Sequence, residues 1–136
     1  MILYHVTDVE NLPSIAEQGL VPSIGRLSQK LGENQQCVYF FHDKEDVVNA
    51  CMNWLGEEFD EIDEEDGYEH QHVVLECRIE PDDHIDTSFY EVGLYYPVEP
   101  KDIRITLDKD LFVDMMYDES FVAGYPALAE WQDQSH

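Results

Sequence analysis

Basic residues are scarce in this sequence. Of its 136 residues, 7 are Lys or Arg and 31 are Asp or Glu, which gives a formal net charge of −24 at pH 7. Full protonation of the 6 His would remove only a quarter of that charge. A surface this negative repels phosphate backbones and anionic lipid headgroups, so we expect no direct binding to nucleic acid or membranes. The same charge favours a basic protein surface as the partner.

Long apolar runs and paired cysteines are also missing. No run approaches the roughly 20 residues of a membrane-spanning helix, and residues 1–5 lack the basic start and apolar stretch of a signal peptide. We therefore expect a cytoplasmic protein. Cys37, Cys51 and Cys77 are widely spaced among apolar neighbours, with no Cys-x-x-Cys pair. This spacing favours reduced, mostly buried thiols over a disulfide framework or the common zinc and redox motifs.

The length and the apolar content fit one domain with an ordinary core. The chain is 43% hydrophobic and 12% aromatic, which argues against global disorder despite the charge. In the first half, runs of β-forming residues alternate with apolar residues at helical spacing. The pattern predicts a strand, a helix, a loop, a strand and a helix, over residues 2–6, 11–19, 21–36, 37–41 and 43–56. Gly19 and Gly56 are expected to end the two helices, and Asp43 to cap the second.

The second half begins with an abrupt change of composition. Eight of the ten residues in 57–66 are acidic, and we interpret 57–69 as a solvated acidic loop inserted into the domain. Alternating residues then predict a long strand over 72–79. Further strands are expected over 89–96, 102–107 and 111–116, without long helices between them. The sequence therefore predicts an α+β domain over 1–117, and a C-terminal segment, 118–136, that is partly packed or flexible.

Several short motifs together resemble the ADP-ribosyltransferase fold. The motifs are Leu3-Tyr4-His5-Val6-Thr7, a helix leading into Gln18-Gly19-Leu20-Val21-Pro22, Val38-Tyr39-Phe40 ahead of a helix, and the stretch from Glu91 to Ile105. Their order is similar to that of the His-Tyr-Glu type found in the poly(ADP-ribose) polymerase branch. The resemblance covers most of residues 2–105. It implies two small, mainly antiparallel sheets that form a cleft, with short helices around them.

The resemblance also implies NAD as the second substrate and a role for each motif residue. Glu91 is the candidate catalytic acid, because a carboxylate beside the reacting ribose can hold its 2′-hydroxyl and stabilise an oxocarbenium-like centre. By the same resemblance, His5 would bind the adenosine-side ribose, Thr7 would support that contact, and Tyr39 would face the nicotinamide or its ribose. The expected activity is transfer of ADP-ribose to a macromolecule, most simply a protein.

Two further groups of side chains are assigned to the NAD site. Trp54 is a candidate second aromatic wall, although its place on the predicted helix also suits plain core packing. Arg26 and Lys30 lie in the loop over 21–36, where their charges could offset the pyrophosphate in a chain that otherwise repels NAD.

Alternatives remain open for the acid and for the activity. Glu99, Asp86 and Asp83 are acids that could replace Glu91, and Val6 stands where enzymes of this group often have Gly. A catalytically inactive member of the fold is therefore one alternative. The other is an acidic inhibitor that mimics DNA and occupies the basic surface of a nucleic-acid enzyme, as small acidic proteins do in conflicts between phage and host.

A metal site is not expected from the sequence. His70 and His72 lie close to the acidic run, but on a strand their spacing puts them on one face without a third ligand. The acidic run also lacks the Asp-x-Asp-x-Asp-Gly order of a calcium loop.

Overall fold

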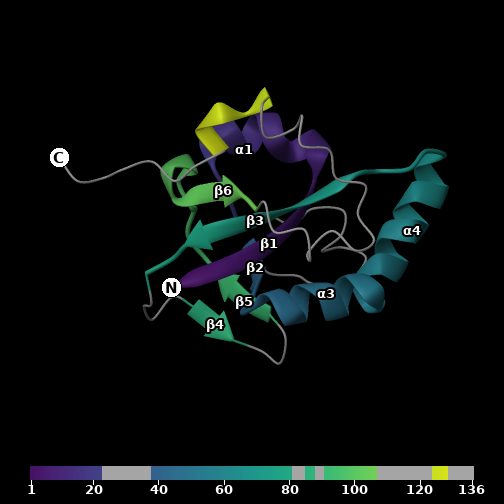
Figure 1. Ribbon diagram of the computed structural model, residues 1–136, viewed down its shortest axis with the longest axis horizontal. Coiled ribbons are helices and arrows are strands. Elements are labelled where there is room, and N and C mark those ends of the chain that lie inside the picture. Colours follow the sequence, from purple (N-terminus) through teal and green to yellow (C-terminus); the bar gives the residue numbers. More distant parts are fainter. Residues whose placement is uncertain (23–37, 81–84, 88–90, 107–123, 129–136) are drawn as a thin grey trace.

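The computed structural model describes residues 1–22, 38–80, 85–87, 91–106 and 124–128, and its strands form one antiparallel sheet of six strands (Figure 1). The strands are β1 (Ile2–Asp8), β2 (Val38–Phe41), β3 (His72–Arg78), β4 (Ile85–Thr87), β5 (Glu91–Leu94) and β6 (Ile103–Ile105). The helices are α1 (Leu12–Gln18), α3 (Lys44–Met52) and α4 (Trp54–Asp66). The short 3-10 helices are η1 (Val9–Asn11), η2 (Pro100–Asp102) and η4 (Pro126–Leu128).

The α+β class is confirmed. The described strands form one sheet, however, and not the expected pair of sheets. Their order is β4-β5-β2-β1-β3-β6. β1 pairs with β3 along its whole length, from Ile2↔Arg78 to Asp8↔His72, and it pairs with β2 on its other edge through Tyr4↔Phe41. Because β1 is hydrogen-bonded on both sides, it joins the strands of the two halves of the chain into one continuous sheet.

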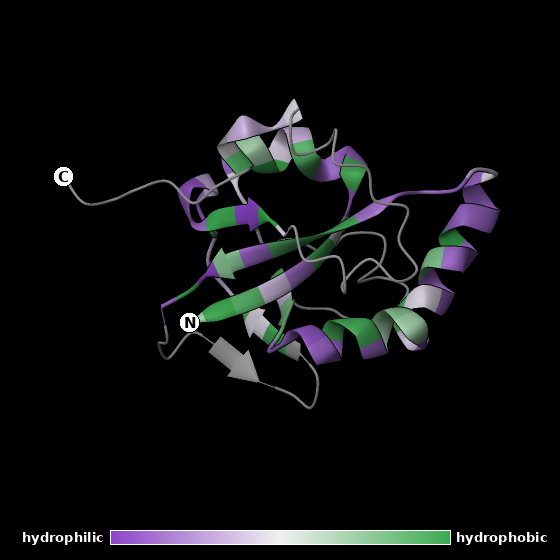
Figure 2. Cartoon of the chain, viewed as in Figure 1, coloured by the Kyte–Doolittle hydropathy of each residue, from purple (hydrophilic) through white to green (hydrophobic). Residues whose placement is uncertain are grey.

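Helices cover both faces of this sheet. Leu3 shares a buried cluster with Leu12 and Ile15 of α1. Its neighbours Tyr4 and Val6 pack on a second cluster, which contains residues of α3 and the start of α4. Since side chains alternate along a strand, the sheet has an α1 face and an α3 face. Figure 2 shows the apolar residues concentrated along the strands, whereas α4 carries hydrophilic residues over much of its length.

The acidic segment is helical, so its interpretation as a loop was wrong. Leu55, Phe59 and Ile62 recur at helical spacing within it, and Glu is a good helix former. Leu55 is buried, and the ring of Phe59 stacks on His72 with 3.8 Å between ring centroids. The helix ends at Gly67, whose φ of 76° is left-handed and whose N–H donates to the Asp63 carbonyl at 2.9 Å.

The predicted helix ends were partly right. Gly19 ends α1 with φ 79°, and the Asp43 carboxylate caps α3 by accepting from the Asp46 N–H at 2.8 Å. Gly56, however, does not end a helix: α3 ends at Met52, and Gly56 lies in the first turn of α4. A Cβ on Gly56 would lie 2.1 Å from the Cys51 carbonyl oxygen, so the glycine allows α4 to start close against the end of α3.

Other expectations fall partly outside the described residues. Neither Cys51 nor Cys77 forms a disulfide, Cys77 is buried, and Cys37 lies outside the described part. The loop over 21–36 and the strand over 111–116 are outside it too, apart from the start of that loop. Within the C-terminal segment 118–136, only 124–128 are described, and Leu128 there is fully buried in the cluster on the α1 face. Among the described helices, none has the length and apolar character to cross a membrane.

The close contact at Gly56 predicts that replacing this helical glycine by alanine destabilises the protein, whereas such a replacement usually stabilises a helix. Helix propensity alone would make Gly56→Ala stabilising by about 1 kcal/mol. Because the new Cβ would overlap the Cys51 carbonyl, we expect Gly56→Ala to lower the free energy of unfolding by about 1–3 kcal/mol instead, measured by urea denaturation. Gly124→Ala is the matched control, since nothing lies within 4 Å of a Cβ there. A stabilised Gly56→Ala protein would contradict the described approach of α4 to α3.

Candidate functional site

The His5 side chain lies on the α1 face of β1, and its ring contacts the neighbouring strand β2. Its Nδ1 lies 2.7 Å from the Tyr39 carbonyl oxygen of β2, and its ring is tilted against Phe40 with centroids 5.6 Å apart. A carbonyl oxygen only accepts, so Nδ1 carries the proton. Burial lowers the pKa of His5, and the hydrogen bond to Tyr39 opposes this effect without reversing it. The ring is therefore neutral at pH 7, and its Nε2 is a hydrogen-bond acceptor.

Thr7 lies two residues further along β1 and on the same face as His5. Its side chain is buried, and its Oγ1 accepts a hydrogen bond from Asn11 Nδ2 at 3.0 Å. Asn11 is the residue before α1, and its side chain bonds to Thr7 without capping the helix. Thr7 thus anchors the turn that leads from β1 into α1.

Tyr39 and Glu91 lie on the next two strands. β2 pairs with β5 in the register Tyr39↔Gly93 and Phe41↔Glu91, so β1, β2 and β5 are neighbours that carry His5, Tyr39 and Glu91 respectively. Phe41 belongs to the cluster on the α3 face, and alternation along β2 puts Tyr39 on that face as well. The structure thus brings the three residues to adjacent strands, with His5 and Tyr39 on opposite faces.

The remaining predicted residues are scattered or lie outside the described part. Trp54 begins α4 and packs on Phe41, with 6.3 Å between ring centroids, as part of the cluster on the α3 face. Among the alternative acids, Glu99 is exposed and pairs with Lys101 at 3.2 Å, and Asp86 lies in β4. Arg26, Lys30 and Asp83 are outside the described residues.

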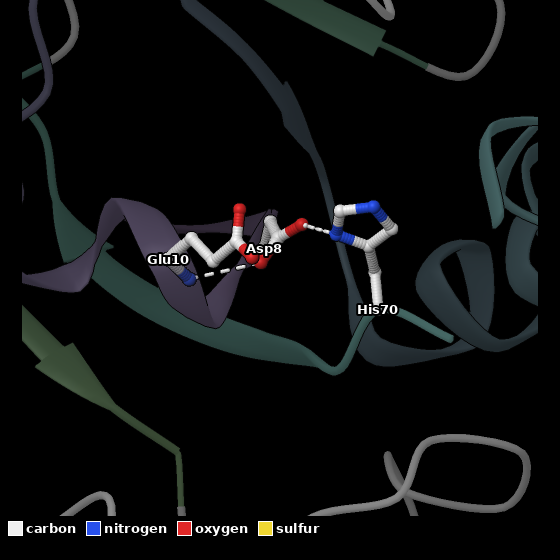
Figure 3. A group of neighbouring side chains, drawn as sticks. All are labelled: Asp8, Glu10 and His70. Atoms are coloured by element: carbon white, nitrogen blue, oxygen red, sulfur yellow. Dashed lines mark hydrogen bonds and ion pairs between the residues drawn. The ribbon is translucent and has the colours of Figure 1, made fainter. Parts of the chain in front are cut away.

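A polar cluster that the sequence reasoning missed lies where β1 ends. Asp8, Glu10 and His70 each offer a ligand atom, and these atoms all lie within 4.8 Å of one another (Figure 3). His70 Nδ1 is 2.5 Å from Asp8 Oδ2, and His70 Nε2 is 2.6 Å from Asp66 Oδ2 at the end of α4. The sequence prediction considered His70 only together with His72, whereas its partners here come from 60 or more residues earlier and from the acidic helix.

The surroundings of His70 determine its electrostatics. Its side chain is 6% exposed, and its backbone N–H donates to Asp63 Oδ1 at 2.9 Å. Burial alone would lower the pKa of His70, but the hydrogen bond to Asp66 and the charge of Asp8 outweigh burial and raise it. His72 differs, because burial lowers its pKa more than the charges of Asp8 and Asp63 raise it, and its ring stacks on Phe59.

Glu76 is the buried acid among the described residues. It lies on β3 and is 6% exposed. One carboxylate oxygen accepts from Arg104 Nε at 2.6 Å and the other from Thr106 Oγ1 at 3.1 Å. Since both oxygens are satisfied by β6 and the residue after it, Glu76 joins the edge strand to the sheet.

Comparisons with known proteins identify no relative: no family model, no curated protein and no solved structure matches the chain.

The geometry around His5 predicts one tautomer and one direction of pH dependence. We expect ring ¹⁵N chemical shifts to show a proton on Nδ1 and none on Nε2 at pH 7, with a pKa below the ordinary 6.5. Because the folded pKa lies below the unfolded one, the unfolded chain binds more protons as pH falls below 6.5, and His5 then destabilises the fold. His5→Asn keeps a donor toward Tyr39 and should flatten this part of the stability profile. A ring protonated on Nε2 at pH 7 would contradict the assignment.

Proposed function

We propose that the protein is an ADP-ribosyltransferase-like enzyme that uses NAD to modify a protein target. The observation that carries the proposal is the adjacency of β1, β2 and β5, the strands that hold His5, Tyr39 and Glu91. These are the three residue types, in the same chain order, on which the resemblance to the His-Tyr-Glu group rests. In the sequence they are separated by 34 and 52 residues, yet the fold brings their strands side by side.

The state of His5 supports a role in binding a ribose. With Nδ1 donating to the Tyr39 carbonyl, Nε2 is left as an acceptor suited to a sugar hydroxyl. A protonated imidazole would offer only donors, so the lowered pKa of His5 preserves this acceptor at pH 7. On the α1 face of the sheet, this acceptor suits a ribose hydroxyl, which is the role that the resemblance gives His5.

The aromatic residues on the α3 face suit the other half of the dinucleotide. Tyr39 lies on the same face as Phe41 and Trp54, and flat rings of this kind pack well on a nicotinamide. Because His5 and Tyr39 lie on opposite faces of one continuous sheet, a single NAD on the α3 face would contact Tyr39 but not the His5 ring.

Glu91 supplies the acid in the proposed reaction. The bond between nicotinamide and its ribose breaks, nicotinamide leaves with the bonding electron pair, and the target's nucleophile forms the new bond to the ribose carbon. A carboxylate near that ribose accepts from the 2′-hydroxyl and stabilises the positive charge that develops on the ring. Glu91 is the first residue of β5 and lies opposite Phe41 of β2.

Labelled NAD tests the proposed activity. We expect label on a basic protein target with the wild type and a loss of at least 100-fold with Glu91→Gln, because the charge that stabilises the oxocarbenium-like centre is gone. His5→Asn should weaken NAD binding in calorimetry, since it retains a donor toward Tyr39 but has no acceptor at the position of Nε2. Glu99→Gln removes an exposed acid and should label normally. Equal labelling by wild type, Glu91→Gln and His5→Asn would refute these assignments. If calorimetry shows no heat of binding with NAD, the proposed enzyme is refuted and the catalytically inactive member of the fold is favoured.

A second function is favoured by the shape of α4, which presents an acidic ridge. Five of its acids are exposed, and at 100° per residue they fall on the side of the helix opposite Leu55, Phe59 and Ile62. The ridge consists of Glu57, Asp60, Glu61, Glu64 and Glu65. A row of carboxylates on a rigid helix can occupy a basic groove that otherwise binds nucleic acid, which is the proposed inhibitor function.

Competition with DNA tests the inhibitor function. We expect the wild type to displace labelled duplex DNA from a DNA-cleaving enzyme, with an effect that weakens as salt rises. Replacing the five ridge acids by their amides should abolish the displacement. The matched control removes the same five charges from exposed acids elsewhere, at Glu17, Glu45, Glu69, Glu80 and Glu99. Equal loss in both variants would show that net charge alone acts, and no displacement by the wild type from any of several such enzymes would remove this function.

A further inference from the structure

We propose that Asp8, Glu10 and His70 form a binding site for a divalent transition-metal cation. The three residues come from separate elements: Asp8 is the last residue of β1, Glu10 lies in η1, and His70 precedes β3. Their candidate ligand atoms lie within 4.8 Å of one another, and Figure 3 shows the carboxylate of Asp8 directed at the imidazole. The site is independent of the residues assigned to NAD and to the acidic ridge.

The buried nitrogen of His70 is the observation that separates this cluster from an ordinary group of acids. The side chain is 6% exposed, and Nδ1 points toward Asp8 Oδ2 at 2.5 Å. Beyond this ion pair, Nδ1 makes no hydrogen bond. A cation bound between Nδ1 and the carboxylates would give this buried nitrogen a directed partner.

The second layer of contacts orients each of the three side chains. Asp66 contacts His70 Nε2 at 2.6 Å, which leaves Nδ1 as the nitrogen on the side of Asp8 and Glu10. Tyr68 donates its hydroxyl to Glu10 Oε1 at 3.2 Å, and the Glu10 N–H donates to Asp8 Oδ1 at 2.9 Å. A carboxylate on the far nitrogen of a histidine is the usual support for a metal-binding imidazole, because it fixes the ring and increases its basicity.

The donor set defines the class of ion. One imidazole nitrogen and two carboxylates suit Zn²⁺, Mn²⁺, Fe²⁺ or Co²⁺ better than Mg²⁺ or Ca²⁺, which prefer oxygen ligands alone. Tetrahedral bonds of about 2.1 Å put ligand atoms roughly 3.4 Å apart, so ion entry has to widen the contact between His70 and Asp8. Three protein ligands leave one position for water, which is the arrangement of a reactive rather than a closed structural site.

Calorimetry with Zn²⁺ and Mn²⁺ on the full chain, freed of metal by chelation, tests the site. We expect one ion per chain, and a loss of affinity on the order of 100-fold or more in Glu10→Gln and His70→Gln, which remove a ligand. Asp66→Asn should weaken binding about 10- to 100-fold by releasing the ring. Glu10 is exposed, so Glu10→Gln keeps the test valid even if His70→Gln loses its fold, which circular dichroism would reveal.

Two matched controls distinguish this site from diffuse attraction to an acidic protein. Glu69→Gln makes the same charge change one residue away from His70, and His42→Gln removes an exposed histidine; both should bind as the wild type does. In the wild type, bound Mn²⁺ should broaden the NMR signals of the His70 ring before those of His42. No binding by the wild type at millimolar ion, or equal affinity in all variants, would overturn the proposal.

Discussion

The pairing of β1 with β3 is the interaction on which the other features depend. Seven residue pairs hold the two strands in one register, and β2 is bonded to the other edge of β1. This register sets Asp8 opposite His72, so the residues just before β3 lie beside the turn that follows β1. The same strand presents His5 to β2. Both candidate sites are therefore arranged around one strand at the centre of the sheet.

The second constraint is the excess of negative charge. α4 has four acids in its last four residues and no basic residue there, although the partial negative charge at a helix C-terminus favours cations. His70 meets this need, since its ring contacts Asp66 and its N–H donates to Asp63. Because the same ring also contacts Asp8, it ties the far end of the acidic helix to the sheet. A helix with this composition is thus held at its start by apolar packing and at its end by one imidazole.

The sequence predicted what depends on local pattern. The strand-forming runs within the described residues, the cap at Asp43 and the helix end at Gly19 follow from short-range chemistry, and these are found. The acidic helix was missed because charge density hid the helical spacing of Leu55, Phe59 and Ile62. The cluster at His70 was missed for another reason: no local spacing connects residue 70 to residues 8 and 10, and only the strand register does.

The positions along β1 also keep the two candidate sites apart. His5 and Asp8 are three residues apart on one strand, so their side chains lie on opposite faces of the sheet. His5 faces the side of α1 and bonds to β2, whereas Asp8 contacts His70, whose other ring nitrogen contacts Asp66 of α4. A change at one of them leaves the contacts of the other in place. An effect of the proposed metal on the proposed NAD site would therefore have to pass through the backbone of β1, and independent behaviour of the two sites is the simpler consequence of this geometry.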